Sequence, residues 1–318
     1  MLVSIGEALV DMLPGATSCS LAQREWNPAV GGAPANVAAA YAILGGKARL
    51  LTGLGSDEYG DLIAQTLKGK GVDLSYAVRI DAKTALAFVS IGEGGERSFT
   101  FLRNPSADML YPGDNLTPET FRDAFALSFS SVSLGDFPMR DAHRIAIRLA
   151  RAAGAKIVFD PNLRPALWDK PEDMRRAVLD FLPEADILKI ADDELAFITG
   201  EKNPEKALPF LFSGRVGLFL CTRGGEGATA YTRSGVSASV PAAKVRAVDT
   251  TGAGDAFLGA FLWRLARTAR DVDPAALPAP ILTDCLAFAC TYAGISVTRP
   301  GAIPSYPTLP ETLQKTAG

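Results

Sequence analysis

Residues 249–257, DTTGAGDAF, combine two glycines and two aspartates directly before an apolar segment. That segment, up to residue 265, is apolar enough to form a buried helix, so the glycines mark its amino-terminal end. Unpaired N–H groups and the helix dipole bind anions at such an end, and glycine lets a phosphate approach the backbone. A tight turn, a flexible loop or a helix cap by Asp255 would also explain this composition. Asp255 is therefore either a capping side chain or a base beside a phosphate site.

A second glycine-rich segment, VGGAPANVAAA at residues 30–40, also lies where a loop enters a helix. It brings the polar side chain of Asn36 into an otherwise apolar helix, although close packing of small residues would explain the segment as well. A kinase needs an acceptor hydroxyl in line with the phosphoryl donor, a base for its proton, and donors for the developing charge. Asp255 would be that base, which typically contributes ~10²–10⁴-fold in rate. The anion hole would be formed by the backbone amides of Gly252, Ala253 and Gly254.

The composition excludes several classes of protein. With 318 residues, 48% of them hydrophobic, 21% charged and a net charge of -3, the chain is typical of globular proteins without attraction to nucleic acid or membranes. No basic region precedes the first apolar segment, and no uninterrupted apolar run reaches the ~18–20 residues of a membrane span. Four cysteines in a chain of this length do not form a disulfide framework. We therefore predict a cytoplasmic protein that binds neither nucleic acid nor membrane.

Two further site types are excluded by residue patterns. The one histidine, His143, rules out a metal site with several histidine ligands, and its surroundings predict a position on a helix surface. Neither GxxxxGK[ST] nor a GxGxxG after the first strand occurs, so the chain has no P-loop and no dinucleotide fingerprint.

Short apolar segments alternate with helical patterns along the chain. This alternation predicts an α/β fold with a mainly parallel central sheet and helices on both faces, in which ligands bind at the carboxyl ends of the strands. The predicted strands include residues 2–6, 48–55, 155–160, 186–190 and 216–222, and the predicted helices include residues 34–46, 59–71, 139–154 and 192–200.

One segment departs from this alternation. Residues 84–104 consist of two strand patterns joined by the turn sequence GEGGE, which predicts a β-hairpin. Because a lone hairpin is marginally stable in water, it needs further strands, and residues 13–30, which include Trp26, are a candidate. We predict a small β-sheet lid formed by residues 13–34 and 83–105 on an α/β core of residues 1–12, 35–82 and 106–318.

The two glycine-rich motifs, taken in order, resemble the two signatures of the ribokinase-like (PfkB) family of carbohydrate kinases. The resemblance covers essentially the whole chain. Within the family, GEALVDMLP, FLRNPSADMLY, DPNLRPALWDKPEDMR and VTRPGAIPSYPT are most similar to fructokinases. The resemblance implies a three-layer core with a β-lid, and transfer of phosphate from ATP, with magnesium, to a primary hydroxyl of a sugar.

The resemblance also implies roles for residues on the sugar side. Asp255 matches the family's base, the amides of residues 252–254 match its anion hole, and Arg164 matches a basic residue near the transferring phosphate. Arg164 would otherwise be a surface arginine, and Phe101 would pack inside the lid. The residues that match sugar-binding positions are Asp11, Gly31, Gly32 and Asn36, and Phe101 and Arg103 match lid positions that close over the substrate.

On the nucleotide side, CTRGGEGA resembles the family's nucleotide turn, and Glu194 matches a glutamate that organises magnesium, through water. Two positions differ from relatives: Ala191 replaces asparagine or serine, and Cys290 replaces an asparagine near adenine, which puts the fine nucleotide contacts in doubt. The residues implied in nucleotide binding are Lys189, Glu194, Thr222, Gly224, Gly227 and Cys290. A potassium-binding loop is implied at Asp249, Thr251, Ser296, Arg299, Gly301 and Ser305.

Together these features predict a fructokinase-like enzyme that makes a sugar 6-phosphate and forms a homodimer through its lid. Rival acceptors are 2-keto-3-deoxygluconate, ribose and a nucleoside. A protein of another class would bind sugar or nucleotide without transferring phosphate, which the intact Asp255 argues against. A nicotinamide dehydrogenase is opposed by the missing dinucleotide fingerprint.

Overall fold

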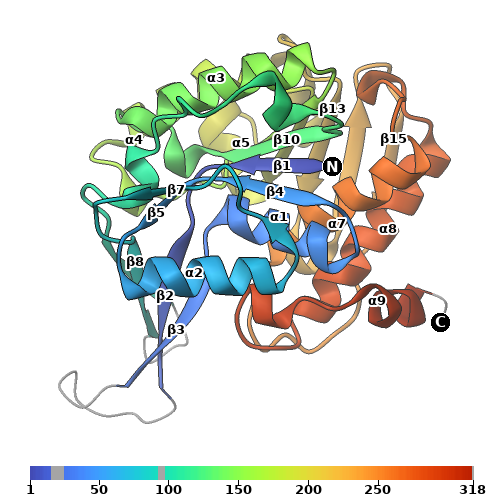
Figure 1. Cartoon of the computed structure of the whole chain (residues 1–318). Helices are drawn as coiled ribbons and strands as arrows, with labels where there is room; N and C mark the ends of the chain where they lie inside the picture. Colours follow the sequence, from blue (N-terminus) through green and yellow to red (C-terminus); the bar gives the residue numbers. More distant parts are fainter. Residues whose placement is uncertain (16–24, 92–96, 317–318) are drawn as a thin grey trace.

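The computed structural model describes residues 1–15, 25–91 and 97–316, and these form a sheet enclosed by two layers of helices (Figure 1). Neighbouring strands from β6 to β13 run parallel, and β14 and β15 are added antiparallel at one edge. The predicted α/β class with a mainly parallel sheet is confirmed. Within these residues the strand order is β15 (Ser237–Val240), β14 (Ala228–Thr232), β13 (Leu218–Thr222), β12 (Ile187–Ala191), β11 (Lys156–Asp160), β10 (Ala126–Ser130), β1 (Leu2–Ile5), β4 (Ala48–Leu51), β6 (Val72–Asp73).

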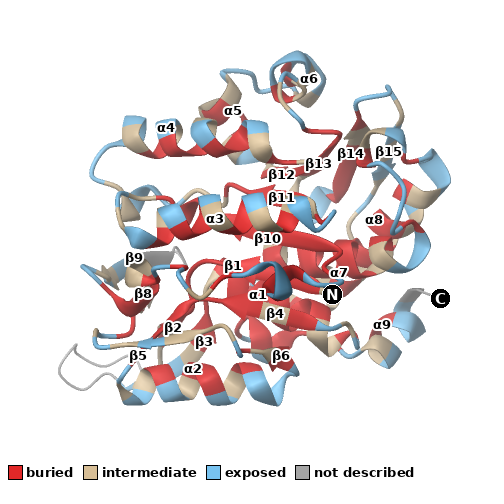
Figure 2. Cartoon of the chain, turned by 45° about the horizontal axis from the view of Figure 1, so that its top comes forward, coloured by how far each residue is buried: buried red, intermediate tan, exposed pale blue. Residues whose placement is uncertain are grey.

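Both faces of this sheet are covered, which explains why its central strands are mostly apolar and buried (Figure 2). Successive side chains of a strand point to opposite faces, so Leu2 of β1 belongs to one hydrophobic core and Val3 to the other. The first core is closed by α1 (Ala33–Ile43), α2 (Glu58–Gly69), α7 (Ala253–Thr268), α8 (Ala279–Ser296) and α9 (Leu309–Thr316). The second is closed by α3 (Pro138–Ala152), α4 (Pro171–Phe181), α5 (Asp192–Thr199) and α6 (Pro204–Leu211).

A second sheet of four strands projects from this core (Figure 1), in the order β3 (Trp26–Gly31), β2 (Leu9–Pro14), β8 (Leu86–Ile91), β9 (Arg97–Leu102). The predicted hairpin corresponds to the antiparallel pair β8–β9, and its turn sequence, residues 92–96, lies outside the described residues. The candidate segment around Trp26 completes the sheet, because β3 pairs with β2, which in turn runs parallel to β8. Trp26 packs edge-on against Phe88, with ring centroids 5.0 Å apart.

Two expectations about single elements are wrong. The strand predicted at residues 48–55 is divided, because β4 stays in the central sheet while β5 (Gly53–Gly55) pairs with β7 (Val78–Ile80). A Cβ added to Gly53 would lie 2.1 Å from the Ala107 carbonyl oxygen, so this glycine permits the close backbone approach where the chain leaves the sheet. His143 is fully buried on α3, where burial lowers its pKa to about 4, and its Nδ1 lies 2.7 Å from the Met139 carbonyl oxygen.

Helix α8 is the most apolar long helix among the described residues, although Asp284 interrupts its apolar run. With 18 residues and a mean hydropathy of 1.3, this helix fits a membrane span by length and composition. However, Leu282, Leu286 and Ala289 are fully buried in the first core, against α7 and the sheet. Such burial is typical of a core helix in a large globular domain.

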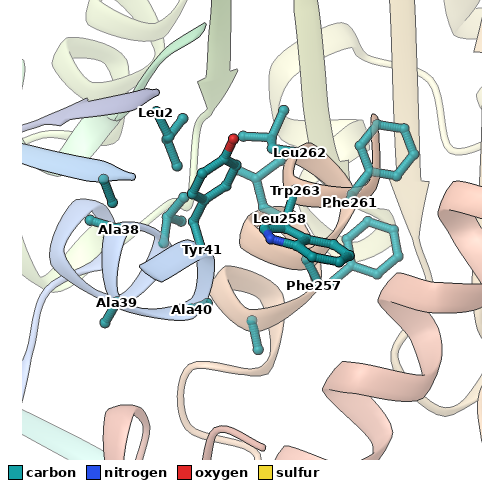
Figure 3. Packing of buried hydrophobic residues seen from close by; sticks show 14 of the residues in the cluster. Leu2, Ala38, Ala39, Ala40, Tyr41, Phe257, Leu258, Phe261, Leu262 and Trp263 are labelled. Atoms are coloured by element: carbon teal, nitrogen blue, oxygen red, sulfur yellow. The ribbon is translucent and has the colours of Figure 1, made fainter. Parts of the chain in front are cut away.

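Helices α1 and α7 meet at a point where neither has a large side chain. A Cβ added to Gly259 would lie 2.7 Å from the Ala40 Cβ and 2.9 Å from the Val37 carbonyl oxygen. Figure 3 shows Ala40 and Tyr41 of α1 beside Leu258 and other core residues of α7. The small residues therefore fix the distance between the helices that carry both glycine-rich motifs.

This contact predicts that Gly259→Ala lowers the free energy of unfolding by about 1–3 kcal/mol, the usual cost of overpacking. The loss should occur although alanine favours a helix by ~1 kcal/mol over glycine. Urea unfolding would measure it. The control is Gly69→Ala at the end of α2, where an added Cβ meets nothing within 4 Å. A Gly259→Ala protein as stable as the parent would contradict the close contact.

Candidate active site

A cavity of about 290 Å³ lies between the core and the four-stranded sheet. Its walls are formed by the loops that follow β1 and β11, by β2 and β9, and by the first turns of α1 and α7. The carboxyl ends of parallel strands meet there, as expected for an α/β sheet. The lining residues are Glu7, Leu9, Asp11, Gly32, Ala33, Asn36, Phe101, Val132, Asn162, Arg164, Leu167, Thr250, Thr251, Gly252 and Asp255.

The two glycine-rich motifs meet at Asp255. This side chain lies in the first turn of α7, is only 8% exposed, and accepts a 2.9 Å hydrogen bond at Oδ2 from Asn36 Nδ2 of α1. Burial raises the pKa of Asp255 to about 7, and the charge of Asp160 adds to this, whereas the Asn36 bond, Lys189 and Arg164 oppose it. A carboxylate with that pKa can accept a proton near neutral pH and release it again.

The amino-terminal end of α7 has the backbone that the sequence predicted. Gly252 is the N-cap residue with φ 72°, a left-handed conformation, and a Cβ there would lie 2.6 Å from the Ala302 Cβ. No side chain caps the helix, and Tyr306 Oη donates to the Gly252 carbonyl oxygen at 3.1 Å. Ala253 N–H donates to the Thr250 carbonyl oxygen at 3.2 Å, which closes the turn ahead of the helix. The start of the helix therefore lines the cavity and has no capping side chain.

A buried lysine lies beneath this turn. Lys189 Nζ donates to Asp160 Oδ2 at 2.8 Å, and a Cβ added to Gly254 would lie 3.1 Å from the same nitrogen. Burial opposes the ammonium charge, but the carboxylates of Asp160, Glu194 and Asp255 raise the pKa of Lys189. The ammonium is therefore charged and adjacent to the start of α7, where an anion would be attracted.

Glu194 joins two strand ends beside this lysine. Its Oε1 accepts the Leu163 N–H at 2.5 Å and its Oε2 accepts the Ala191 N–H at 3.1 Å. The loop held in this way includes Asn162, whose φ of 45° is unusual for a residue other than glycine, and the exposed Arg164 at the cavity. Glu194 thus fixes the loop from which Arg164 reaches the site.

The predicted nucleotide residues lie outside the cavity lining, and three of them are at the end of β13 and in the turn after it. Thr222 ends β13, next to Ala191 of β12, and Gly224 and Gly227 follow in the turn. At Gly227, with φ 106°, an added Cβ would lie 2.1 Å from the Val240 carbonyl oxygen. Cys290 of α8 is buried, which raises the pKa of its thiol to about 11. The charge of Arg223, which precedes Gly224 in the turn after β13, opposes this rise.

The residues predicted to bind potassium lie in two segments, one at Asp249 and Thr251 and the other from Ser296 to Ser305. Asp249 accepts the Thr251 N–H at Oδ1 (2.8 Å) and the Gly301 N–H at Oδ2 (2.9 Å), which brings two distant segments together. Ser296 Oγ donates to the Ala293 carbonyl oxygen of α8, and Ser305 Oγ donates to the Ala302 carbonyl oxygen. Arg299 pairs with Glu311. In the described ranges, no group of three His, Cys, Asp or Glu side chains is arranged to hold a metal ion.

The residues predicted on the lid side are divided between the cavity and its surroundings. Asp11 and Phe101 line the cavity, and burial raises the pKa of Asp11 to about 6. Gly31 leaves room for that carboxylate, since an added Cβ would lie 2.4 Å from Asp11 Oδ2. Arg103 is not a lining residue, because its guanidinium forms a buried ion pair with Asp108 at 2.6 Å.

The sequence analysis missed several lining residues, among them Glu7, Val132 and Asn162. Glu7 and Asn162 each lie two residues beyond a parallel strand, β1 and β11. Their position at strand ends was a usable signal, because those ends gather at one edge of the sheet. Val132 follows β10 in a short 3-10 turn and carries no chemical signal in the sequence.

Comparisons with known proteins identify the family of this chain. Residues 1–309 match the model of the pfkB family of carbohydrate kinases. The chain is 43% identical to fructokinase-1 of Zea mays over 318 residues, 99% of this chain and 97% of the relative. The crystal structure of a Xylella fastidiosa fructokinase with bound ATP is 34% identical, with a TM-score of 0.91 over 100% of this chain and 99% of that one. A Vibrio cholerae O395 fructokinase double mutant, in a form with fructose, ADP and potassium ion bound, is 31% identical with a TM-score of 0.85, covering 98% of this chain and 97% of that one.

The predicted resemblance is therefore confirmed over nearly the whole chain, from the first strand to the start of α9. This protein belongs to the pfkB family of carbohydrate kinases.

Proposed function

We propose that the protein is an ATP-dependent fructokinase that converts D-fructose and ATP to fructose 6-phosphate and ADP. The observation that carries the proposal is the buried Asp255, held by Asn36 at the start of α7 inside a cavity of sugar size. The relatives named fructokinase support fructose as the acceptor.

In this proposal Asp255 removes the proton from the sugar hydroxyl as its oxygen attacks the γ-phosphorus, and the bond from that phosphorus to the ADP oxygen breaks. The amides of residues 252–254 would hold the transferring phosphoryl group, for which the Ala253 N–H would exchange its bond to the Thr250 carbonyl oxygen, and Lys189 and Arg164 would balance its charge. Asn36 Oδ1 is buried without a partner among the described residues, so a sugar hydroxyl could donate to it. Asp11, Gly31 and Gly32 would complete the sugar contacts.

The nucleotide would lie along the ends of β12 and β13, beside Thr222, Gly224, Gly227 and Cys290. Magnesium would neutralise phosphate charge there, held by ATP oxygens and the carboxylates nearby. Asp160 Oδ1 is buried with no partner in the described part of the chain, which fits such a ligand. Glu194 already accepts two backbone N–H groups, which agrees with contact through water.

We further propose that the four-stranded sheet is a lid, within residues 13–34 and 83–105, that excludes water when sugar binds. The edge strands β3 and β9 leave backbone groups for pairing with a second copy, which supports a homodimer. A protein that sediments as a monomer at all concentrations would remove the dimer from the proposal.

Potassium activation is a separate part of the proposal. Asp249 joins the two segments of the predicted loop, and the Vibrio cholerae fructokinase structure includes a potassium ion. A bound monovalent cation would offset negative charge beside the start of α7. Equal rates in potassium and tetramethylammonium would exclude this activation.

A cytoplasmic location completes the proposal. Its support is the supply of ATP that the reaction requires and the burial of the one apolar helix long enough to reach across a bilayer among the described residues. Cell fractionation that recovered the protein in membranes would contradict it.

The substrate proposal predicts that D-fructose is phosphorylated with the highest kcat/KM in a panel with ribose, 2-keto-3-deoxygluconate and nucleosides. A site that hydrogen-bonds sugar hydroxyls rejects acceptors that leave buried partners unpaired. An ADP-coupled assay at fixed ATP would measure the panel. Faster turnover of another acceptor would change the substrate, and no ADP with any acceptor would favour a binding protein.

The base proposal predicts that Asp255→Asn lowers kcat by ~10²–10⁴-fold and leaves fructose binding nearly unchanged in calorimetry. The same change should stabilise the fold above neutral pH. The folded pKa of about 7 lies above the usual value, so wild-type stability falls as the pH rises from ~4 to 7 and Asp255 ionises. Asparagine does not ionise, so the stability of Asp255→Asn relative to the wild type increases over the same pH range. Asp193→Asn, on the exposed face of α5, is the control, and near-normal kcat in Asp255→Asn would place the base elsewhere.

The pKa of Asp255 predicts that kcat falls as the pH decreases through about 7, because the protonated carboxyl cannot accept the hydroxyl proton. Asn36→Ala removes a hydrogen bond that stabilises the ionised Asp255, so the acid limb of the pH–rate profile should move to higher pH. The pH–rate profile at saturating fructose and ATP would show the shift. Asn115→Ala, which removes an amide bonded to Tyr111 away from the cavity, should leave the limb in place.

A further inference from the structure

Glu7 is a buried carboxylate for which the proposed chemistry has no role. It is 2% exposed, lies two residues beyond β1 and lines the cavity. Its oxygens accept hydrogen bonds from Ala33 N–H at 3.1 Å, Ser133 Oγ at 2.7 Å and Ser130 Oγ at 3.3 Å. These donors come from α1 and from the end of β10 and the turn after it, so Glu7 ties three elements together at the site.

The bond to Ala33 caps helix α1 from a distant part of the sequence. The N-cap residue of α1 is Gly32, with φ 101°, so the helix has no capping side chain, and no acidic residue occupies its first turn. A side chain at this position is excluded, because a Cβ on Gly32 would lie 2.5 Å from the Glu7 carbonyl oxygen. A carboxylate is stabilised at a helix start by the unpaired N–H groups and the dipole. Glu7 therefore supplies the acceptor and the charge that α1 lacks.

The capped turn leads directly to the proposed base. Asn36 N–H donates to the Gly32 carbonyl oxygen at 2.8 Å, and its side chain donates to Asp255 at 2.9 Å. A shift of the first turn of α1 would therefore move the Asn36 amide relative to Asp255. Other charged groups face both carboxylates: Asp160, Lys189 and Arg164 face Asp255, and Arg103 and Asp108 face Glu7.

We infer that Glu7 is a positioning residue for phosphoryl transfer, which fixes the first turn of α1 and thereby holds Asn36 against Asp255. The inference rests on the proposed kinase function. Glu7 acts through Asn36 in this account, so its loss changes the rate of transfer and the pH at which the base ionises. A direct contact with sugar would change the sugar KM.

The test is Glu7→Gln, which keeps the side-chain shape and removes the charge. We expect kcat for fructose to fall by roughly 10- to 100-fold, as when a reacting group is displaced by about 1 Å, while the fructose KM changes little. The acid limb of the pH–rate profile should move to higher pH, because Asn36 then stabilises the charged Asp255 less well. The control is Asp186→Asn at the opposite edge of the sheet, which removes a half-buried carboxylate that accepts the Ile157 N–H. This variant should leave kcat and the fructose KM unchanged.

A double-mutant cycle tests the route. In an Asn36→Ala background, Glu7→Gln should lower kcat no further, because the amide it positions is absent. An equal fall in both backgrounds, an unchanged Glu7→Gln enzyme, or a raised fructose KM with normal kcat would each overturn the inference. Should Glu7→Gln lose its near-ultraviolet circular dichroism, Ser133→Ala, which removes the shortest donor to Glu7, takes its place with the same expectations.

Amide hydrogen exchange tests the positioning role of Glu7 independently of the proposed kinase function. Amides in the first turn of α1 should exchange faster in Glu7→Gln than in the parent protein, whether or not the protein turns over fructose. Unchanged protection would contradict the positioning role. Failure of the parent protein to phosphorylate any sugar would instead remove the proposed function.

Discussion

The hydrogen bond between Asn36 and Asp255 is the interaction on which the site depends. It joins the first turns of two core helices that are otherwise lined with small and apolar side chains. A buried carboxylate is costly unless polar partners surround it, so the bond fixes where α1 and α7 start relative to each other. The close approach at Gly259 fixes the same helices one turn further along. The geometry of the site is therefore a consequence of core packing.

Most of the charged groups around this bond are buried. Lys189 is held by Asp160, close to Glu194 and Asp255, so one buried ammonium faces several carboxyl groups below the start of α7. Burial, together with the charge of Asp160, keeps the pKa of Asp255 high although Lys189 opposes this. Stability is thereby lost at the place where function requires charge, as is common at functional sites.

The sequence was most informative where backbone geometry and chemistry coincide. The two glycine-rich segments predicted helix starts, and alternating apolar segments predicted a parallel sheet with a site at its carboxyl edge. The predictions were wrong where tertiary packing decides. Nothing in residues 48–55 shows that the backbone near Ala107 divides the strand, and nothing around His143 shows that its ring is buried. Glu7 could be placed near the edge but not at α1, since that contact spans 26 residues.

The passage from β3 into α1 has a mechanical consequence. Strand β3 ends at Gly31 and α1 begins at Ala33, so Gly32 alone separates the projecting sheet from the helix that carries Asn36. Its φ of 101° leaves few other residues able to occupy the position. A displacement of β3 at Gly32 would therefore move the first turn of α1 and the Asn36 amide that donates to Asp255, so the projecting sheet and the buried carboxylate are mechanically coupled.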